Sequence, residues 1–362
     1  LIHTVQIASL ASVYDNTDIC KAATLKAYRA FSRIVVTDSD IPEDQEKIFC
    51  ILEESIQREP IGICAELNGS ARTLSIDETF LKSIGAKVKR INGKPREFAH
   101  AILPEGESLT MCKNELERLH AQDPAFLLGY VPDNDGDRGN IVYIDTATKQ
   151  AHILDSQEVF ALACVAELAF LDYSEGLVST VTLRQKAKRA IVVNDPTSLR
   201  IERIARVFGV KVFRAEVGEA NVVNLARDLR KSGFTVRILG EGSNGGNITH
   251  PAAVRDPLNT IFAFIKLLRI KDSTDRKGLF RLWCEKSGQN NVYKEDFGIN
   301  DILDTLPKFT TTRVRPRSSR KRSAGARGGL PPPALWLSRR VSTRAVRLRT
   351  STSSAMPPPR TT

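Results

Sequence analysis

Strand-length apolar runs alternate with segments of helical pattern along most of this chain, and this alternation limits the folds available to it. The first such stretch contains the apolar runs IGICAEL (61–67) and AFLLGYV (125–131). The second contains AIVVN (190–194) and FTVRILGE (234–241). Strands that alternate with helices pair in parallel and carry helices on both faces of their sheet. The pattern predicts an α/β fold of two successive three-layer α/β/α domains with mixed, mostly parallel sheets.

Two local signals add detail to the first domain. The segments NIVYID (140–145) and AHILD (151–155) flank the polar turn TATKQ, which predicts an antiparallel hairpin. Ser75 precedes the helical segment DETFLKSIG, and Glu78 follows three residues later. This spacing is that of a capping box, which predicts a helix that starts at Ser75.

Pattern and composition together divide the chain into four parts. Residues 1–57 are mixed and partly helical, residues 58–152 and 153–310 are the two α/β domains, and residues 311–362 are an Arg-, Pro- and Ser-rich tail. The tail has no periodicity and is expected to be disordered. From residue 307 onward the chain holds 14 of its 53 Lys and Arg residues and none of its 42 acidic residues. The net charge of +11 therefore belongs to the tail, and the remainder is slightly acidic.

Composition also narrows the classes of partner. The basic tail would suit salt-dependent binding to nucleic acid, but it has one aromatic residue, Trp336, and no folded platform, so this partner is less favoured. No apolar run approaches the roughly 20 residues needed to cross a bilayer, and no basic segment typical of a signal peptide precedes the first apolar run. Six scattered cysteines without a CxxC pair argue against a disulfide framework or a zinc knuckle. We expect a cytoplasmic protein without a membrane partner.

The stretch VPDNDGDRGNIVYID (131–145) places Asp133, Asp135 and Asp137 on alternate residues directly after a buried strand. Ligand sites of α/β sheets lie at this end of the strands. Three carboxylates so close together repel one another unless a cation lies between them, and Mg²⁺ prefers oxygen ligands of this kind. Arg138 follows at once and could hold a phosphate oxygen beside the metal. A solvated polar turn is the alternative, because Asp, Asn and Gly are common turn residues.

At this point the residues resemble a known family. DNDGDR (133–138) is similar to the DxDxDR metal loop of the α-D-phosphohexomutases, the phosphoglucomutase and phosphomannomutase superfamily. GEGSNGG (240–246) resembles the sugar-recognition loop of that family, usually written GExSGH, although it has an extra Asn244 and no His. The order of strands and helices before that loop and the closing LPKF (306–309) also resemble the third domain of that family. The resemblance therefore covers roughly residues 58–310.

The resemblance implies a function and a set of site residues. Asp133, Asp135 and Asp137 would bind Mg²⁺, and Glu241 and Ser243 would hydrogen-bond sugar hydroxyls. The implied enzyme is an isomerase that interconverts hexose 1-phosphate and hexose 6-phosphate, with glucose or mannose as the sugar. The phosphoryl group would pass through a phosphoserine with the help of Mg²⁺.

Two loops that the family uses are not found in this sequence. No loop like TASHNP supplies the phosphoserine, and RKRSAGARGG (320–329) is only a superficial echo of the phosphate-binding loop of the fourth domain. Residues 1–57 resemble the end of the first domain. We expect a chain truncated at its N-terminus and shifted in reading frame near residue 313, which lacks mutase turnover. A non-catalytic remnant that binds metal or sugar phosphate is the alternative.

Overall fold

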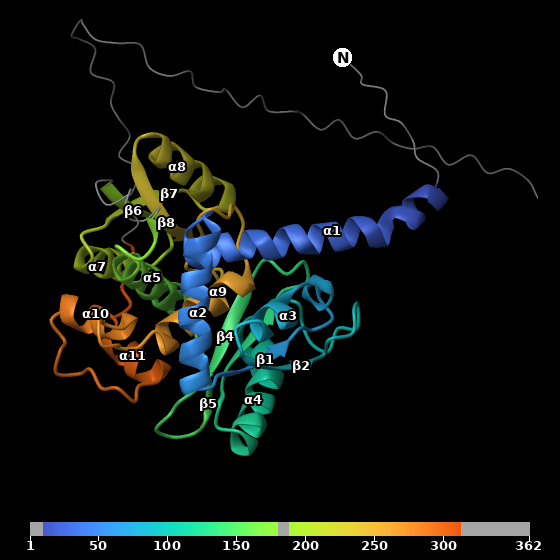
Figure 1. Cartoon of the computed structure of the whole chain (residues 1–362), viewed down its shortest axis with the longest axis horizontal. Coiled ribbons are helices and arrows are strands. Elements are labelled where there is room, and N and C mark those ends of the chain that lie inside the picture. The colour runs from blue at the N-terminus through green and yellow to red at the C-terminus, as the bar shows by residue number, and fades with distance from the viewer. Residues whose placement is uncertain (1–9, 180–187, 313–362) are drawn as a thin grey trace, which may run out of the picture. The chain divides into compact units, whose positions relative to one another are not determined.

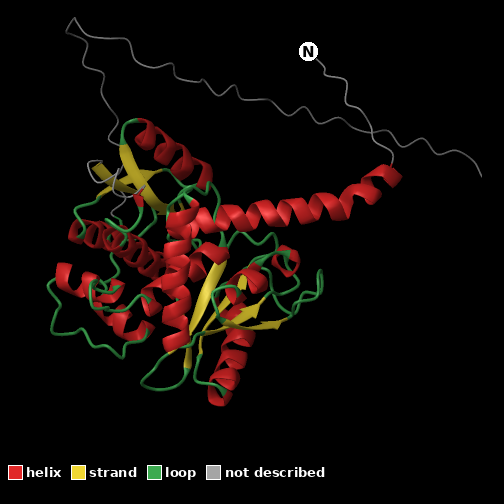
Figure 2. Cartoon of the chain, viewed as in Figure 1, coloured by secondary structure: helices red, strands yellow, loops and turns green. Residues whose placement is uncertain are grey.

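The computed structural model describes residues 10–179 and 188–312, and these contain two β-sheets surrounded by helices (Figures 1 and 2). All described residues belong to one compact unit, Leu1–Arg313. Apart from residues 311 and 312, the predicted tail lies outside the described residues. The predicted α/β class with mixed sheets is confirmed. The predicted domain boundary at residues 152 and 153 stays a prediction.

The first sheet has the strand order β2-β1-β3-β4-β5. Its strands are β1 (Gly62–Glu66), β2 (Lys87–Ile91), β3 (Phe126–Pro132), β4 (Gly139–Ile144) and β5 (Ala151–Ile153). β1 pairs in parallel with β2 and β3, whereas β3, β4 and β5 pair antiparallel. The predicted hairpin is therefore confirmed as β4 and β5. Helix α4 (Thr110–Gln122) packs on this sheet through Cys112 and Leu116, which contribute to one apolar cluster with Val131 and Val142.

The second sheet has the strand order β7-β6-β8-β9. Its strands are β6 (Lys188–Asn194), β7 (Lys211–Ala215), β8 (Phe234–Gly240) and β9 (Ile248–Thr249). β6 pairs in parallel with β7 and β8, and the short β9 runs antiparallel to β8. Helix α8 (Glu219–Lys231) buries Val222 and Ala226 in an apolar cluster that includes Val192 and Val236 of this sheet. The alternating pattern thus produced the parallel pairs that it predicted.

Helices α5 (Ser156–Tyr173) and α9 (Pro257–Arg269) lie in the centre of the molecule and are buried on nearly all sides. They share one apolar cluster with both sheets, for example with Tyr130 of β3 and Ile238 of β8. The other described helices surround this core. They are α1 (Leu10–Thr37), α2 (Pro42–Arg58), α3 (Asp77–Lys82), α7 (Arg200–Val207), α10 (Leu279–Lys286), α11 (Ile299–Thr305) and the 3₁₀ turns η1 (Ala71–Leu74) and η2 (Gly106–Leu109).

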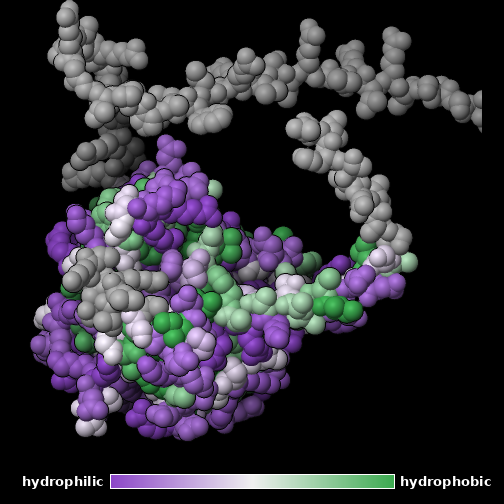
Figure 3. Space-filling view, turned by 45° about the horizontal axis from the view of Figure 1, so that its top comes forward, coloured by the Kyte–Doolittle hydropathy of each residue, from purple (hydrophilic) through white to green (hydrophobic). Residues whose placement is uncertain are grey.

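Helix α1 extends beyond the body of the molecule (Figure 1), and its first half is exposed. The large exposed apolar side chains of α1 are Val13, Tyr14, Ile19 and Phe31, and apolar patches are visible along this helix in Figure 3. None of the described helices combines the length and the apolar character required to cross a membrane.

The predicted capping box at Ser75 is wrong. Ser75 ends the turn η1, and helix α3 begins at Asp77 with Ile76 as its N-cap residue. Glu78 forms ion pairs with Lys82 and with a neighbouring strand instead of turning back to Ser75. Tertiary partners therefore outweighed the local capping signal, as they commonly do.

Candidate functional site

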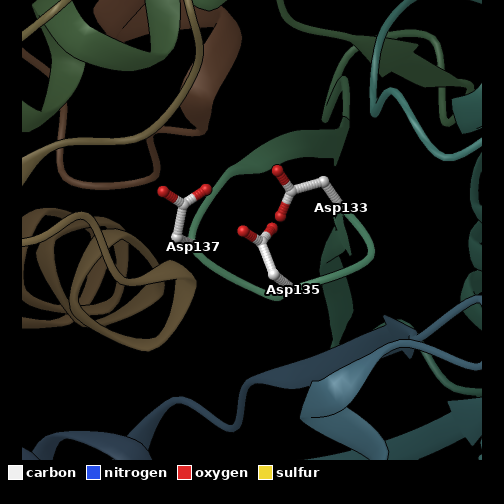
Figure 4. A group of neighbouring side chains, drawn as sticks. All are labelled: Asp133, Asp135 and Asp137. Carbon is white, nitrogen blue, oxygen red and sulfur yellow. The ribbon is translucent and has the colours of Figure 1, made fainter. Parts of the chain in front are cut away.

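The three aspartates lie on the loop between β3 and β4 and gather in one place (Figure 4). One carboxylate oxygen each of Asp133, Asp135 and Asp137 lies within 4.8 Å of the others. The carboxylate of Asp133 accepts hydrogen bonds from the backbone N–H groups of Gly136 and Arg138, both at 3.1 Å, which tighten the turn. Gly136 has φ +81°, a conformation that glycine adopts without strain. The predicted convergence of the three side chains is thus present.

The acidic loop has more negative charge than its cationic neighbours balance. Burial and the charges of Asp137 and Asp135 raise the pKa of Asp133 to about 6. The hydrogen bond from the backbone N–H of Arg138 acts in the opposite direction and lowers this pKa. Arg138 lies with its Nε 3.6 Å from Asp133, and its side chain is partly exposed. A half-buried set of carboxylate oxygens with uncompensated charge fits a hard divalent cation such as Mg²⁺. Which residues bind a metal stays a prediction.

A buried polar network contacts the acidic loop through the turn η1. The backbone N–H of Ala71 donates to the carbonyl of Asn134, and a Cβ on Gly136 would lie only 2.7 Å from Cδ of Arg72. Arg72 forms a bidentate ion pair with Asp77, with distances of 3.0 and 2.7 Å. These contacts position the loop against the turn η1.

Helices α1 and α9 contribute to the same network. The hydroxyl of Tyr28, on α1, donates to Asp256, the N-cap of α9, over 2.5 Å. Arg72 donates to that hydroxyl over 3.0 Å and lies 3.3 Å from Asp256. Tyr130 of β3 donates to Asp77 over 2.9 Å. Burial, together with the charge of Asp256, raises the pKa of Tyr28 far above its ordinary value, so its hydroxyl keeps its proton. Four separate chain segments are therefore joined beneath the acidic loop.

The second predicted loop connects β8 and β9, and protein groups hold its Glu241 in place. One carboxylate oxygen accepts from the side-chain amide of Asn194 at 3.0 Å and from the N–H of Gly218 at 2.6 Å. The other accepts from the side-chain amide of Asn244 at 2.8 Å. Burial opposes ionisation, but these donors keep the pKa of Glu241 below its ordinary value. Ser243 donates to Asn244 over 3.4 Å, so the extra Asn244 bonds to both predicted sugar contacts.

The structure brings the two loops together. A Cβ on Gly245 would lie 2.7 Å from the side-chain oxygen of Asn140, in β4 directly after the acidic loop. A Cβ on Gly246 would lie 3.8 Å from the backbone nitrogen of Gly139, at the first residue of β4. The loops are about 100 residues apart in the sequence, and both contribute to one region.

The sequence did not indicate Arg255, which joins the acidic loop to helix α8. Its Nη2 lies 3.2 Å from Asp137, and its Nε donates to Glu219 over 2.9 Å. Only 6% of its side chain is exposed. The sequence holds no signal for this role, because Arg255 lies more than 100 residues from the acidic loop and outside both motifs.

Part of this chain is similar to a known protein family. Residues 174–283 match the family model "Phosphoglucomutase/phosphomannomutase, alpha/beta/alpha domain III". No curated protein sequence matches the chain. The resemblance to the α-D-phosphohexomutases is thereby confirmed, and residues 174–283 match the third domain of that family. The family consists of mutases, which are isomerases.

Several solved structures match parts of the chain at low identity and with TM-scores below 0.5. A phosphoglucomutase/phosphomannomutase family protein from Burkholderia thailandensis is 15% identical, covers 72% of this chain and 47% of its own, and gives a TM-score of 0.47. An N-acetylphosphoglucosamine mutase from Aspergillus fumigatus is 12% identical, with coverages of 74% and 48% and a TM-score of 0.38. An N-acetylglucosamine-phosphate mutase in its substrate complex is 14% identical, with coverages of 73% and 50% and a TM-score of 0.38. The chain thus spans about half the length of these proteins.

Proposed function

We propose that this chain carries the divalent-cation site and part of the sugar-phosphate site of a phosphohexomutase. The enzyme would interconvert hexose 1-phosphate and hexose 6-phosphate, with glucose or mannose as the sugar and a phosphoserine as the phosphoryl carrier. The observation that supports this proposal is the meeting of the acidic loop with the loop at residues 240–246. The N-acetylphosphoglucosamine mutase from Aspergillus fumigatus was crystallised in complex with glucose 1,6-bisphosphate, which agrees with a ligand of this class.

The residues of the chain would divide the work by their chemistry. Asp133, Asp135 and Asp137 would hold Mg²⁺, which when bound offsets negative charge on a phosphoryl group. Arg138 is partly exposed and would hold a phosphate oxygen through its planar guanidinium. Glu241 and Ser243 would contact sugar hydroxyls, and Glu241 is already ionised and oriented by its amide donors. The sequence contains no serine loop of the family type, so we propose binding without turnover.

Metal binding tests the first half of the proposal. Free Mn²⁺, a paramagnetic substitute for Mg²⁺, is measured by electron paramagnetic resonance in titrations of the wild-type protein and of Asp135→Asn. We expect saturable binding by the wild type, weakened by about tenfold or more in the variant, because affinity follows the number of charged ligands. Asp145→Asn is the matched control, since Asp145 caps another turn after β4 through the N–H of Ala147. Equal loss in both variants would refute the assignment.

Ligand binding and turnover test the second half. Calorimetric titration with glucose 1-phosphate in the presence of Mg²⁺ should show binding that Ser243→Ala weakens. A coupled assay for glucose 6-phosphate should detect no product. Product formation by the purified chain would contradict the proposed lack of turnover, and absence of heat at millimolar ligand would contradict the sugar-phosphate site.

A further inference from the structure

Arg255 lies between β9 and α9 and is held by one carboxylate from the acidic loop and one from helix α8. Its Nη2 contacts Asp137 at 3.2 Å, and its Nε donates to Glu219, the first residue of α8, over 2.9 Å. The backbone N–H of Arg255 also donates to Glu219, over 3.2 Å. Its Nη1 is buried and has no hydrogen-bond partner among the described residues. One guanidinium is therefore shared by two carboxylates and is incompletely bonded.

The position of this guanidinium conflicts with metal binding by Asp137. A divalent cation at the acidic loop and the guanidinium would both require the negative charge of the same carboxylate. Arginine remains charged at any ordinary pH, so it cannot relieve the repulsion by losing a proton. It can only weaken metal binding or move away from Asp137. The repulsion is strong here, because Arg255 is 6% exposed and solvent screens buried charges poorly.

We propose that Arg255 is a resident counter-cation that a divalent cation displaces from Asp137. This inference rests on the proposed metal site and adds a form of regulation to it. Without metal, Arg255 joins the acidic loop to helix α8, which packs on the second sheet. With metal, the ion pair with Asp137 opens, and the guanidinium keeps Glu219 as its partner. Metal occupancy is thus linked to the contact between the acidic loop and α8, and the linkage is reciprocal.

A different role for Arg255 would give the opposite result. If the guanidinium served only as a strut that shapes the acidic loop, its removal would distort the loop and weaken metal binding. If it competes with the metal, its removal strengthens metal binding. The sign of the change therefore separates a competitor from a structural support.

The experiment compares three variants by Mn²⁺ titration with electron paramagnetic resonance at one ionic strength. Arg255→Gln removes the charge, and we expect Mn²⁺ to bind about tenfold more tightly than to the wild type. Arg255→Lys keeps the charge, and its affinity for Mn²⁺ should be close to that of the wild type. Glu219→Gln removes the negative charge of the second partner, so Arg255 should hold Asp137 more strongly and Mn²⁺ should bind several-fold more weakly. Within the described part of the chain, the carboxylate of Glu219 accepts hydrogen bonds from Arg255 and not from the acidic loop, which keeps this variant informative if Arg255→Gln fails to fold.

Each outcome decides between the two proposals. Binding by Arg255→Gln that equals or falls below that of the wild type would overturn the competitor and leave the metal site intact. Binding by Arg255→Gln alone, with none by the wild type, would support a competitor that blocks the site. If Arg255→Gln does not fold, unchanged or tighter binding by Glu219→Gln overturns the inference. Absence of binding in every protein would refute both the metal site and the inference.

Discussion

Replacement of Arg237 by Met should destabilise the protein more than any single change on its surface. Arg237 lies in β8, its side chain is 1% exposed, and its guanidinium donates to acceptors from three other segments. Nε donates to Glu167 of α5 over 2.7 Å, and Nη1 donates to Asp38 over 3.1 Å and to the carbonyl of His250 over 2.7 Å. Nη2 donates to the carbonyl of Val35 over 2.7 Å. Methionine keeps an unbranched apolar stem, is shorter than arginine, and removes every one of these donors.

The expected cost follows from the charge that remains in the core. Arg237 and Lys266 together balance Asp38 and Glu167, and Lys266 lies 2.6 Å from Glu167. After the change to Met, one buried cation remains for two buried carboxylates. Removal of one partner from a buried ion pair costs about 3–5 kcal/mol. This is a large part of the roughly 5–15 kcal/mol by which folded domains are stable.

Urea denaturation followed by circular dichroism measures the change in the free energy of unfolding. Lys231→Met is the matched control, because Lys231 pairs with Asp228 at 3.1 Å while both side chains are more than 70% exposed. We expect a change of at most about 1 kcal/mol there. The double variant Arg237→Met/Asp38→Asn should recover part of the loss, since it removes one surplus carboxylate charge. A loss for Arg237→Met no larger than that of the control would refute the reasoning.

Three further predictions concern the core and the acidic loop. Gly136→Ala should destabilise the protein more than Gly209→Ala in urea denaturation: both glycines have positive φ (+81° and +67°), but only the first meets a side-chain carbon 2.7 Å from its new Cβ. Burial lowers the pKa of Lys266 to about 8. Above that pH the unfolded chain binds more protons than the folded protein, so the free energy of unfolding should rise between about pH 8 and 10 relative to that of Lys266→Met. Phe262→Ala should cost about 3–5 kcal/mol, because the ring is buried with another aromatic ring centred 5.1 Å away.

The local sequence pattern predicted the strands and their pairing correctly in several places. The hairpin of β4 and β5 followed from apolar segments around a polar turn, and the parallel pairs followed from the alternation of strands and helices. At Ser75 the local pattern did not decide the structure. Its spacing to Glu78 satisfied a local rule, but Asp77 pairs with Arg72 and Tyr130, and helix α3 begins there instead. Side chains from distant segments decided the start of that helix.

The candidate site was predictable only as far as its parts are local. The spacing of Asp133, Asp135 and Asp137 placed three carboxylates within one turn, and the structure keeps them within 4.8 Å. Arg72 and Arg255 were not predictable, because they reach the loop from segments at least 60 residues away and belong to no motif. Partners of this kind depend on the tertiary fold.

The charges around the acidic loop also imply an order of binding for the proposed ligands. Asp133, Asp135 and Asp137 together with Glu219 contribute four carboxylates, whereas Arg138 and Arg255 contribute two cationic groups. A sugar phosphate carries nearly two further negative charges at neutral pH. The metal-free region therefore repels the ligand, and a bound divalent cation would cancel the net negative charge of these groups. Electrostatics favours binding of the cation before the hexose phosphate.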